Sequence, residues 1–316
     1  MELRQLHYFL KIAEHKSLSR AAVELGIGVS ALSQQVSKLE GELSTRLLNR
    51  TTSGVTPTSA GVAFLHHAQL AVRQASNAMH AAQRGRMSGY VSVGLPPTTA
   101  GVLALPLIER MRERYPDIQL HLVEMLSGHL AGQLNARQLD LAIVFQADTR
   151  RRWHVTPLLD EKLFLIAVPG LPDLPETATA PIACLGHIRL VMPSARHGLR
   201  TTLMTAFERF ETEPNIVMEI DGLATLMEAV RAGHAATIQP GAAAAGLGST
   251  GLRMVEISDA HVGRRNLLAS LSDEELSPAA LAARVAIIEV TRELVSSGRW
   301  PGASLQMAET REVSGL

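Results

Sequence analysis

The stretch between Ser17 and Leu39 constrains the fold more strongly than any other part of this sequence. It contains two short helical patterns, and Gly26-Ile27-Gly28 separates them because glycine tolerates the backbone angles of a sharp turn. In the second pattern, Leu32, Val36 and Leu39 recur at helical spacing and form one buried stripe. The stretch is therefore expected to fold as a helix-turn-helix.

The second of these helices, which is expected to start at about Val29, has a polar face outside its buried stripe. A helix that buries aliphatic side chains and exposes hydroxyls, amides and a lysine suits a DNA major groove. An ordinary surface helix has the same pattern, so the surrounding segments have to decide between the two interpretations. The residues of this polar face are Ser30, Ser33, Gln34, Ser37 and Lys38.

The segments around the helix-turn-helix are typical of a small DNA-binding module. Ser19 is expected to cap its first helix by accepting a hydrogen bond from a free backbone N–H. Extended, threonine-rich segments around Ser53-Gly54 predict a hairpin. Arg50 and the hairpin hydroxyls, Thr56 among them, suit phosphates or a minor groove. An amphipathic helix over Leu3–His15 precedes the stretch, and its expected inner face is Leu6, Phe9, Leu10 and Ala13.

The charge distribution also favours a basic N-terminal module. The formal net charge of the chain is zero, yet residues 1–90 contain 10 Lys and Arg against 5 Asp and Glu, and the remainder contains 20 against 25. A basic segment joined to an acidic one is typical of a DNA-binding module carried by a second domain. Because the excess is modest, non-specific DNA binding should be weak and steeply dependent on salt.

A long helix is expected to follow, capped by Thr58 and ending at about Arg84. Its apolar residues recur at alternating spacings of three and four, which is the pattern of a coiled-coil seam. The seam could pack on its own chain, but we favour a symmetric dimer because dimeric readers match paired half-sites. His66 and His67 diverge on a helix and are poor joint metal ligands. The seam consists of Leu65, Ala68, Val72, Ala75, Met79 and Ala82.

After Gly89, short aliphatic strands alternate with helical patterns. This alternation predicts parallel sheets with helices on both faces, in two small lobes rather than one. Ser277-Pro278 should start a late helix that buries Leu281, Val285 and Ile288, and order should end at Trp300-Pro301-Gly302. The candidate strands are Tyr90–Leu95, Ile118–Glu124, Leu139–Phe145, Phe164–Val168, Ile188–Met192, Ile216–Ile220, Ala235–Ile238 and Leu267–Leu271.

Composition excludes several classes of protein. Of the 316 residues, 46% are hydrophobic and 19% are charged, which indicates a globular rather than a disordered chain. Cys184 is the only cysteine, so a disulfide framework and cysteine-rich metal sites are excluded. We find no signal peptide and no apolar run near the ~18 residues of a membrane span. A cytoplasmic protein without metal or cofactor is expected.

Taken together, the motifs of residues 1–90 closely resemble the winged helix-turn-helix of LysR-type transcriptional regulators. They are Met1-Glu2-Leu3-Arg4-Gln5-Leu6 with Tyr8-Phe9, Ser17-Leu18-Ser19-Arg20-Ala21-Ala22, Ala31-Leu32-Ser33-Gln34-Gln35-Val36, Leu47-Leu48-Asn49-Arg50 and Thr56-Pro57-Thr58-Ser59-Ala60-Gly61. The resemblance extends over nearly the whole chain, through Gly94-Leu95-Pro96, Arg114-Tyr115-Pro116, Leu139-Asp140-Leu141-Ala142 and Ala232-Gly233-His234. Within the family, the chain looks most like the nitrogen assimilation control subgroup, at Leu39-Glu40-Gly41-Glu42-Leu43 and Gly54-Val55-Thr56-Pro57-Thr58.

The resemblance implies an α+β multidomain protein. A winged helix-turn-helix DNA-binding domain would cover residues 1–58, a dimerisation helix 59–87, an effector-binding domain 88–300 and a C-terminal tail 301–316. The effector domain would form two α/β lobes similar to periplasmic solute-binding proteins, with 88–163 and 264–300 in the first lobe and 164–263 in the second. The family also implies a homodimer, often a homotetramer, that binds promoter DNA and acts on RNA polymerase.

Base contacts in the family come from the start of the recognition helix. This places them here at Val29, Ser30, Ser33 and Gln34, with Lys38, Arg50 and Thr56 as further DNA-contacting residues. Relatives commonly read Ser-Gln-Pro-Ala-Leu-Ser-Arg where this chain has Gly28-Val29-Ser30-Ala31-Leu32-Ser33-Gln34. Because a capping serine, an amide and an arginine of that pattern are absent, the target sequence of the relatives does not transfer to this chain.

The family's effector cleft lies between the lobes, where strand ends and helix N-termini converge. Backbone N–H groups near the start of a helix suit an anionic effector. Capping or loop bonds would explain any single candidate residue equally well, and some relatives act without a known inducer. A regulator of the same fold without a small-molecule effector is therefore the alternative. The candidate effector-binding residues are Thr98, Thr99, Ser127, Phe145, Ser194 and His197.

Two other classes compete with a regulator. Gly246, Gly248 and Gly251 spell a dinucleotide-binding G-x-G-x-x-G, but an alanine run rather than a strand precedes them, and no catalytic triad or zinc spacing is evident. A secreted solute-binding protein would explain residues 90–300 but not the first 90, and it would need an export signal. We therefore expect a DNA-binding protein and not an enzyme.

Overall fold

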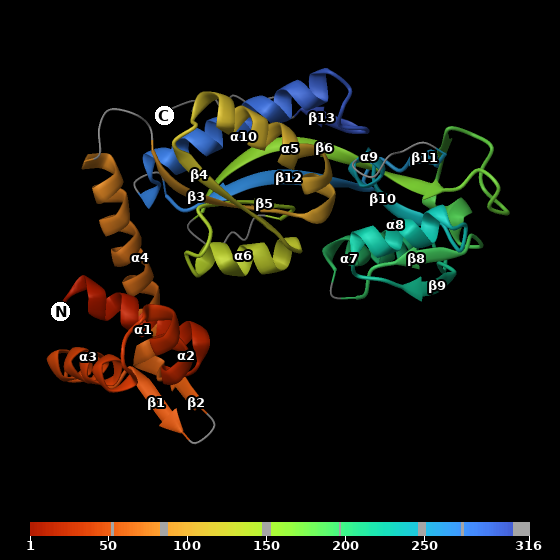
Figure 1. The fold of residues 1–316 in the computed structure, drawn as a ribbon. Coiled ribbons are helices and arrows are strands. Elements are labelled where there is room, and N and C mark those ends of the chain that lie inside the picture. Colours follow the sequence, from red (N-terminus) through yellow and green to blue (C-terminus); the bar gives the residue numbers. More distant parts are fainter. Residues whose placement is uncertain are drawn as a thin grey trace, which may run out of the picture. The chain divides into compact units, whose positions relative to one another are not determined.

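A computed structural model describes residues 1–51, 54–82, 88–146, 153–195, 197–245, 251–272 and 275–305 (Figure 1). The chain divides into two compact units, residues 1–89 and 90–316. Each unit has its own hydrophobic core, and the two are described separately below.

The N-terminal unit is a helix-turn-helix with a hairpin wing, as the sequence predicted. Its elements are α1 (Leu3–His15), α2 (Leu18–Leu25), α3 (Val29–Glu42), β1 (Leu48–Thr51), β2 (Gly54–Pro57) and α4 (Ser59–Ala82). The stripe of α3 is fully buried and packs with Phe9 and Ile12 of α1. At the turn, Gly26 adopts a left-handed conformation with φ of 66°, which glycine permits without a steric penalty.

The cap of α2 differs from the prediction. Ser17, not Ser19, lies in extended conformation before the helix, and its hydroxyl accepts a hydrogen bond from the backbone N–H of Arg20 at 3.4 Å. Ser19 lies inside the first turn and is exposed. The helix therefore begins earlier than the Ser19 cap required.

The long helix α4 begins after Thr58, whose hydroxyl accepts a hydrogen bond from the N–H of Gly61 at 2.9 Å, which confirms the predicted cap. Three seam residues pack against the core of their own unit, whereas a dimer contact was expected of them: Leu65, Ala68 and Val72. The face of α4 that remains exposed includes Val62 (61% exposed), Ala63, Ala71 and Ala78. The side chains of Met79 and Ala82 lie outside the described residues.

The C-terminal unit begins with a three-layer arrangement. Its first elements are β3 (Gly89–Leu95), α5 (Pro97–Arg114), β4 (Ile118–Glu124), α6 (Ser127–Asn135) and β5 (Leu141–Val144). Alternate residues of β5 point to opposite faces, with Leu141 and Ile143 in the core beneath α5 and α10 (Pro278–Ser296), and Ala142 and Val144 in the core beneath α6 (Figure 1). This is the βα alternation predicted from the sequence.

The rest of the unit forms a second group of strands and helices. Its elements are β6 (His154–Ala167), β7 (Thr179–Ala180), the 3-10 helix η1 (Ile182–Leu185), β8 (Leu190–Met192), α7 (Gly198–Arg209), β9 (Ile216–Glu219), α8 (Leu223–Arg231), β10 (Thr237–Pro240), α9 (Ala242–Ala245) and β11 (Arg253–Ile257). The chain then returns to the first group through β12 (Gly263–Ser270), α10 and β13 (Ala303–Leu305).

The strand β6 belongs to both groups. Its first part pairs with β12 and β13, and its last part pairs with β10 and β11, all antiparallel. The cores divide along it, because Leu158 and Leu159 pack with α5 and α10, whereas Leu163 and Leu165 pack with α7 and η1. Two lobes therefore share β6, and β12 makes the return crossing.

Several expectations for this unit differ from the structure. Parallel pairing holds for β3 with β5, β7 with β11 and β8 with β9, but the strands around β6 are antiparallel. Order continues past Gly302, because Trp300 is 1% exposed and β13 pairs with β6. Helix α10 buries its alanine-rich side with Ile287 and Val290, whereas Val285 is 46% exposed.

The predicted cap of α10 is present, since the hydroxyl of Ser277 accepts a hydrogen bond from the N–H of Ala280. Residues 246 and 248 of the glycine motif lie outside the described residues. Among the helices that the structure describes, none combines the length and the apolar character needed to cross a lipid bilayer.

Candidate functional site

The outward face of α3 carries the predicted DNA-contacting residues. Ser30, Gln34 and Lys38 are exposed, Val29 is 44% exposed, and Ser33 is half-buried. The helix begins after Gly28 without a side-chain cap, in keeping with the missing serine noted in the sequence. Its first-turn N–H groups are therefore not occupied by a capping side chain among the described residues.

The hairpin wing, β1 and β2, is hydrogen-bonded to the polar face of α3. Arg50 of β1 donates from Nη1 to the hydroxyl of Ser33 at 2.8 Å and from Nη2 to the hydroxyl of Ser37 at 3.3 Å. At the base of the wing, the carboxylate of Glu40 accepts hydrogen bonds from the backbone N–H groups of Leu47 and Leu48 at 2.7 and 3.0 Å. Two helical turns of α3 thus hold the guanidinium beside the polar face.

The remaining two predicted contacts, Thr56 and Lys38, make no hydrogen bond to Arg50 that the structure records. Thr56 is exposed on β2, where it pairs with Asn49. Lys38 lies 3.8 Å from a carboxylate oxygen of Glu2. Hydroxyls, an amide, a guanidinium and an ammonium group on one surface can bind phosphates and base edges.

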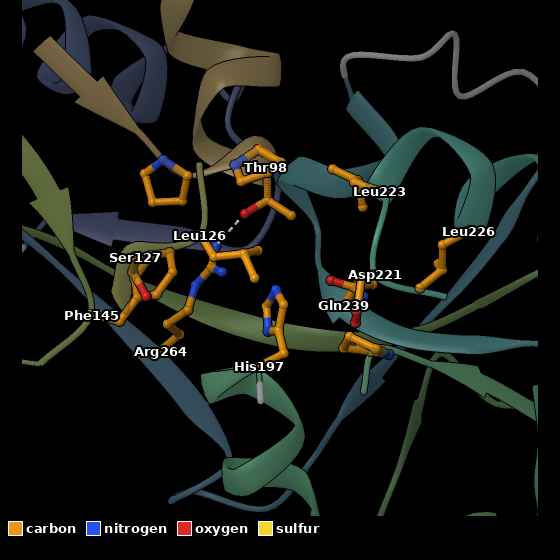
Figure 2. A pocket seen from close by; sticks show the side chains of 13 residues that line it. Thr98, Leu126, Ser127, Phe145, His197, Asp221, Leu223, Leu226, Gln239 and Arg264 are labelled. Carbon is orange, nitrogen blue, oxygen red and sulfur yellow. Dashed lines mark hydrogen bonds between the residues drawn. The ribbon is translucent and has the colours of Figure 1, made fainter. Parts of the chain in front are cut away.

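A second candidate site is a cleft between the two lobes of the C-terminal unit (Figure 2). Strand ends and helix N-termini supply its walls, and its interior holds only about 30 Å³. The cleft is lined by Pro96, Pro97, Thr98, Leu126, Ser127, Phe145, Pro193, His197, Asp221, Leu223, Leu226, Gln239 and Arg264.

Arg264, near the start of β12, dominates this cleft. Its guanidinium carbon lies 3.8 Å from the ring centroid of Phe145, and its Nη2 donates to the hydroxyl of Thr98 at 2.8 Å (Figure 2). Its Nε and Nη2 both donate to Oε2 of Glu161, at 2.9 and 2.5 Å. The side chains of Arg264 and Glu161 are 8% and 0% exposed, so the ion pair is buried.

Glu161 is the centre of a wider buried network. Besides Arg264, its Oε2 accepts a hydrogen bond from Nδ2 of Asn266 at 2.7 Å, and its Oε1 accepts one from Nε1 of Trp300 at 2.7 Å. Asn266 in turn accepts a hydrogen bond from the hydroxyl of Thr99 at 3.2 Å. Both carboxylate oxygens are satisfied, as a buried charge requires.

The opposite wall presents His197 and Asp221. His197 caps α7, because its Nδ1 accepts a hydrogen bond from the N–H of Leu199 at 3.3 Å. Burial and, to a lesser degree, the positive charge of Arg264 lower the pKa of His197, and Asp221 partly opposes this. Asp221 accepts a hydrogen bond from the N–H of Ser194 at 2.8 Å.

Four of the six predicted effector residues line the cleft: Thr98, Ser127, Phe145 and His197. Thr99 is instead buried against Asn266, and Ser194 is not among the lining residues. Sequence reasoning missed Arg264, Asp221 and Gln239. Arg264 stands next to Arg265 in the sequence. Two adjacent arginines are typical of a solvent-exposed surface, so no local sequence pattern identifies Arg264 as a cleft residue.

The described residues contain no group of three or more His, Cys, Asp or Glu side chains that could hold a metal ion. Cys184 is exposed and free.

Two known families match different parts of the chain. Residues 3–62 match the family described as bacterial regulatory helix-turn-helix protein, lysR family, and residues 84–292 match the LysR substrate binding domain.

Two nitrogen assimilation regulatory proteins, both named nac, are similar in sequence. The protein of Klebsiella aerogenes is 34% identical over 311 residues, which is 97% of this chain and 99% of the relative. The protein of Escherichia coli (strain K12) is 35% identical over 250 residues, which is 78% of this chain and 81% of the relative.

Solved structures share the fold. A full-length variant of OxyR from Pseudomonas aeruginosa superposes with a TM-score of 0.75 at 21% identity and covers 97% of this chain and 99% of its own. Full-length CbnR in complex with its target DNA gives a TM-score of 0.65 at 22% identity and covers 92% of this chain and 100% of its own.

Proposed function

Since this chain belongs to the LysR family of bacterial regulatory helix-turn-helix proteins, we propose that it binds specific promoter sequences as a homodimer and that a small molecule in the interlobe cleft modulates its activity. The chain is a DNA-binding transcriptional regulator with an effector-binding domain. The operator, the effector and the contact with RNA polymerase belong to the proposal.

The observation that carries the DNA-binding part is the polar face of α3 with Arg50 fixed on it. Ser30, Ser33 and Gln34 would reach base edges from the first turns of the helix, because recognition helices insert their N-terminal residues into the major groove. Arg50, Lys38 and Thr56 would contact the sugar-phosphate backbone. Val29 would supply an apolar contact to a thymine methyl group.

A homodimer would present two such faces to paired half-sites, and two dimers could assemble into a tetramer. Helix α4 is the element we propose for the dimer contact. Because Leu65, Ala68 and Val72 are used inside the unit, the partner would meet the neighbouring stripe of the helix, in which Ala71, Ala75, Ala78 and Ala82 recur at spacings of four and three residues and Met79 lies at the edge.

The effector part rests on the cleft lined by Thr98, Ser127, Phe145 and His197, with Arg264 as the main cation. An effector with an anionic group would meet Arg264 and the N-terminal end of α5. The observation that favours the alternative, a regulator without a small-molecule effector, is that only about 30 Å³ remains in the cleft, with the guanidinium of Arg264 packed on Phe145. No residue is proposed as catalytic.

Selection of bound duplexes from a random-sequence library tests the proposal. We expect one enriched, two-fold symmetric motif. Gln34→Ala should relax selectivity at one base pair of each half-site at a cost of about 1–3 kcal/mol, because one amide contact is lost. The exposed Glu14→Ala on α1 serves as a matched control that should leave the motif unchanged. Absence of any enriched motif, or an unchanged motif with Gln34→Ala, contradicts the assignment.

A further inference from the structure

We propose that the cleft is a guanidinium-binding site and that Arg264 of the chain itself is its resident ligand. The inference rests on the proposed function only for its regulatory meaning, since the occupancy itself concerns atoms that the structure places. A small-molecule effector with an anionic group would then act by drawing the guanidinium of Arg264 away from Glu161 and pairing with it, rather than by entering an empty site.

The first argument is the small volume that remains empty inside the cleft beside Arg264. The interior of the cleft holds about 30 Å³, which is room for roughly two water molecules. A metabolite with a carbon skeleton needs several times this space. Arg264 is among the residues that line the interior, and moving its planar head group away from Phe145 would free the space that a ligand needs.

The second argument is the completeness of the contacts. A guanidinium group is recognised by a carboxylate, by hydroxyl acceptors and by an aromatic face. Arg264 meets one of each: Nη2 lies 2.5 Å from Oε2 of Glu161 and 2.8 Å from the hydroxyl of Thr98, and the guanidinium carbon lies 3.8 Å from the ring centroid of Phe145. Figure 2 shows the guanidinium between Thr98 and Phe145, with His197 beside it.

The third argument is that the receptor for this cation is held rigidly. Asn266 and Trp300 both donate to Glu161, so the carboxylate keeps its place whatever the position of Arg264. All three residues are buried, with Glu161 2% exposed, Asn266 0% and Trp300 1%. Such a preorganised anion should bind a free planar cation once the tethered one has been removed.

Chemical rescue in the full-length protein tests this proposal. In Arg264→Ala, the thermal midpoint of the tryptophan fluorescence transition should fall, and 20 mM guanidinium chloride should restore at least about 2 °C more than 20 mM sodium chloride does. Arg265→Ala is the matched control, because the side chain of Arg265 is 63% exposed and its Nε lies 3.4 Å from Asp160. Neither Arg265→Ala nor the parent protein should gain from guanidinium.

A destabilised Arg264→Ala that guanidinium does not rescue, or an equal gain in Arg265→Ala, overturns the proposal. If Arg264→Ala does not fold, nuclear magnetic resonance of ¹⁵N-arginine-labelled protein provides a second test of the proposal. One slowly exchanging Nε–H resonance should persist in Arg265→Lys and disappear in Arg264→Lys, and its presence in both overturns the proposal. Neither readout involves DNA, so failure to find an operator would remove the proposed function and leave this result intact.

Discussion

Replacing Glu161 by glutamine should cost the second unit about 3–5 kcal/mol, because the change leaves the buried guanidinium of Arg264 without its counter-charge. The side chain of Glu161 is 0% exposed, and two nitrogens of Arg264 reach the same carboxylate oxygen at 2.9 and 2.5 Å. Glutamine has nearly the same volume, so no cavity contributes to the loss. The amide NH₂ would moreover face either the Nε1–H of Trp300 or the donors of Asn266 and Arg264, depending on its orientation.

Urea unfolding followed by tryptophan fluorescence measures this loss selectively. The sequence contains two tryptophans, Trp153 and Trp300, and both lie in the second unit, so unfolding of the N-terminal unit leaves the signal unaffected. At a denaturant dependence of about 3 kcal/mol per molar urea, the midpoint should fall by about 1–1.7 M. Far-ultraviolet circular dichroism should show the same shift in its second-unit phase.

Asp160→Asn is the control, since the side chains of Asp160 and Arg265 are 48% and 63% exposed and surface ion pairs contribute about 0–1 kcal/mol. The double variant Glu161→Gln, Arg264→Gln should lose much less than the sum of the single variants, because the stranded charge disappears with its partner. Additive losses, or a midpoint shift for Glu161→Gln no larger than that of Asp160→Asn, would refute the reasoning.

Two further predictions concern the helix α4 and the cleft. Ala71→Glu should convert the dimer into monomers in sedimentation experiments while far-ultraviolet circular dichroism shows the helices intact, whereas Val72→Glu should destabilise the N-terminal unit, because Val72 packs against its core; a folded, dimeric Ala71→Glu would exclude this face. The lowered pKa of His197 means that the unfolded chain binds a proton more readily than the folded one, so stability should fall as the pH drops below about 6.5. The urea midpoint between pH 7.5 and 5.5 should therefore fall less in His197→Gln than in the parent protein, and an identical fall in both would disprove the role of this histidine.

The N-terminal unit was predictable from sequence because its determinants are local. The stripe of Leu32, Val36 and Leu39 and the turn at Gly26 each depend on residues within one or two helical turns. The cap at Ser17 was missed, since Ser17 and Ser19 are chemically equivalent and only the backbone conformation distinguishes them. Which apolar residues of α4 face their own unit depends on packing against α1, which periodicity does not reveal.

The cleft was predictable only in part. Thr98, Ser127, Phe145 and His197 follow strand ends, where ligand sites of α/β folds gather, and that positional rule found them. Arg264 and Glu161 are 103 residues apart, so no local pattern connects them. The expected strand Phe164–Val168 covers only the end of β6, whose first part carries charged residues at positions 160–162, although Glu161 is buried.

The late position of Trp300 and β13 in the chain has a consequence for synthesis. Both dock on β6, and the bond between Trp300 and Glu161 spans 139 residues, so the sheet stays unfinished until Trp300 and β13 have been translated. The N-terminal unit, residues 1–89, has a core of its own and is free to fold while the second unit is still being made. A nascent chain that stalls before Trp300 would thus contain a folded N-terminal unit joined to a second unit that lacks Trp300 and β13.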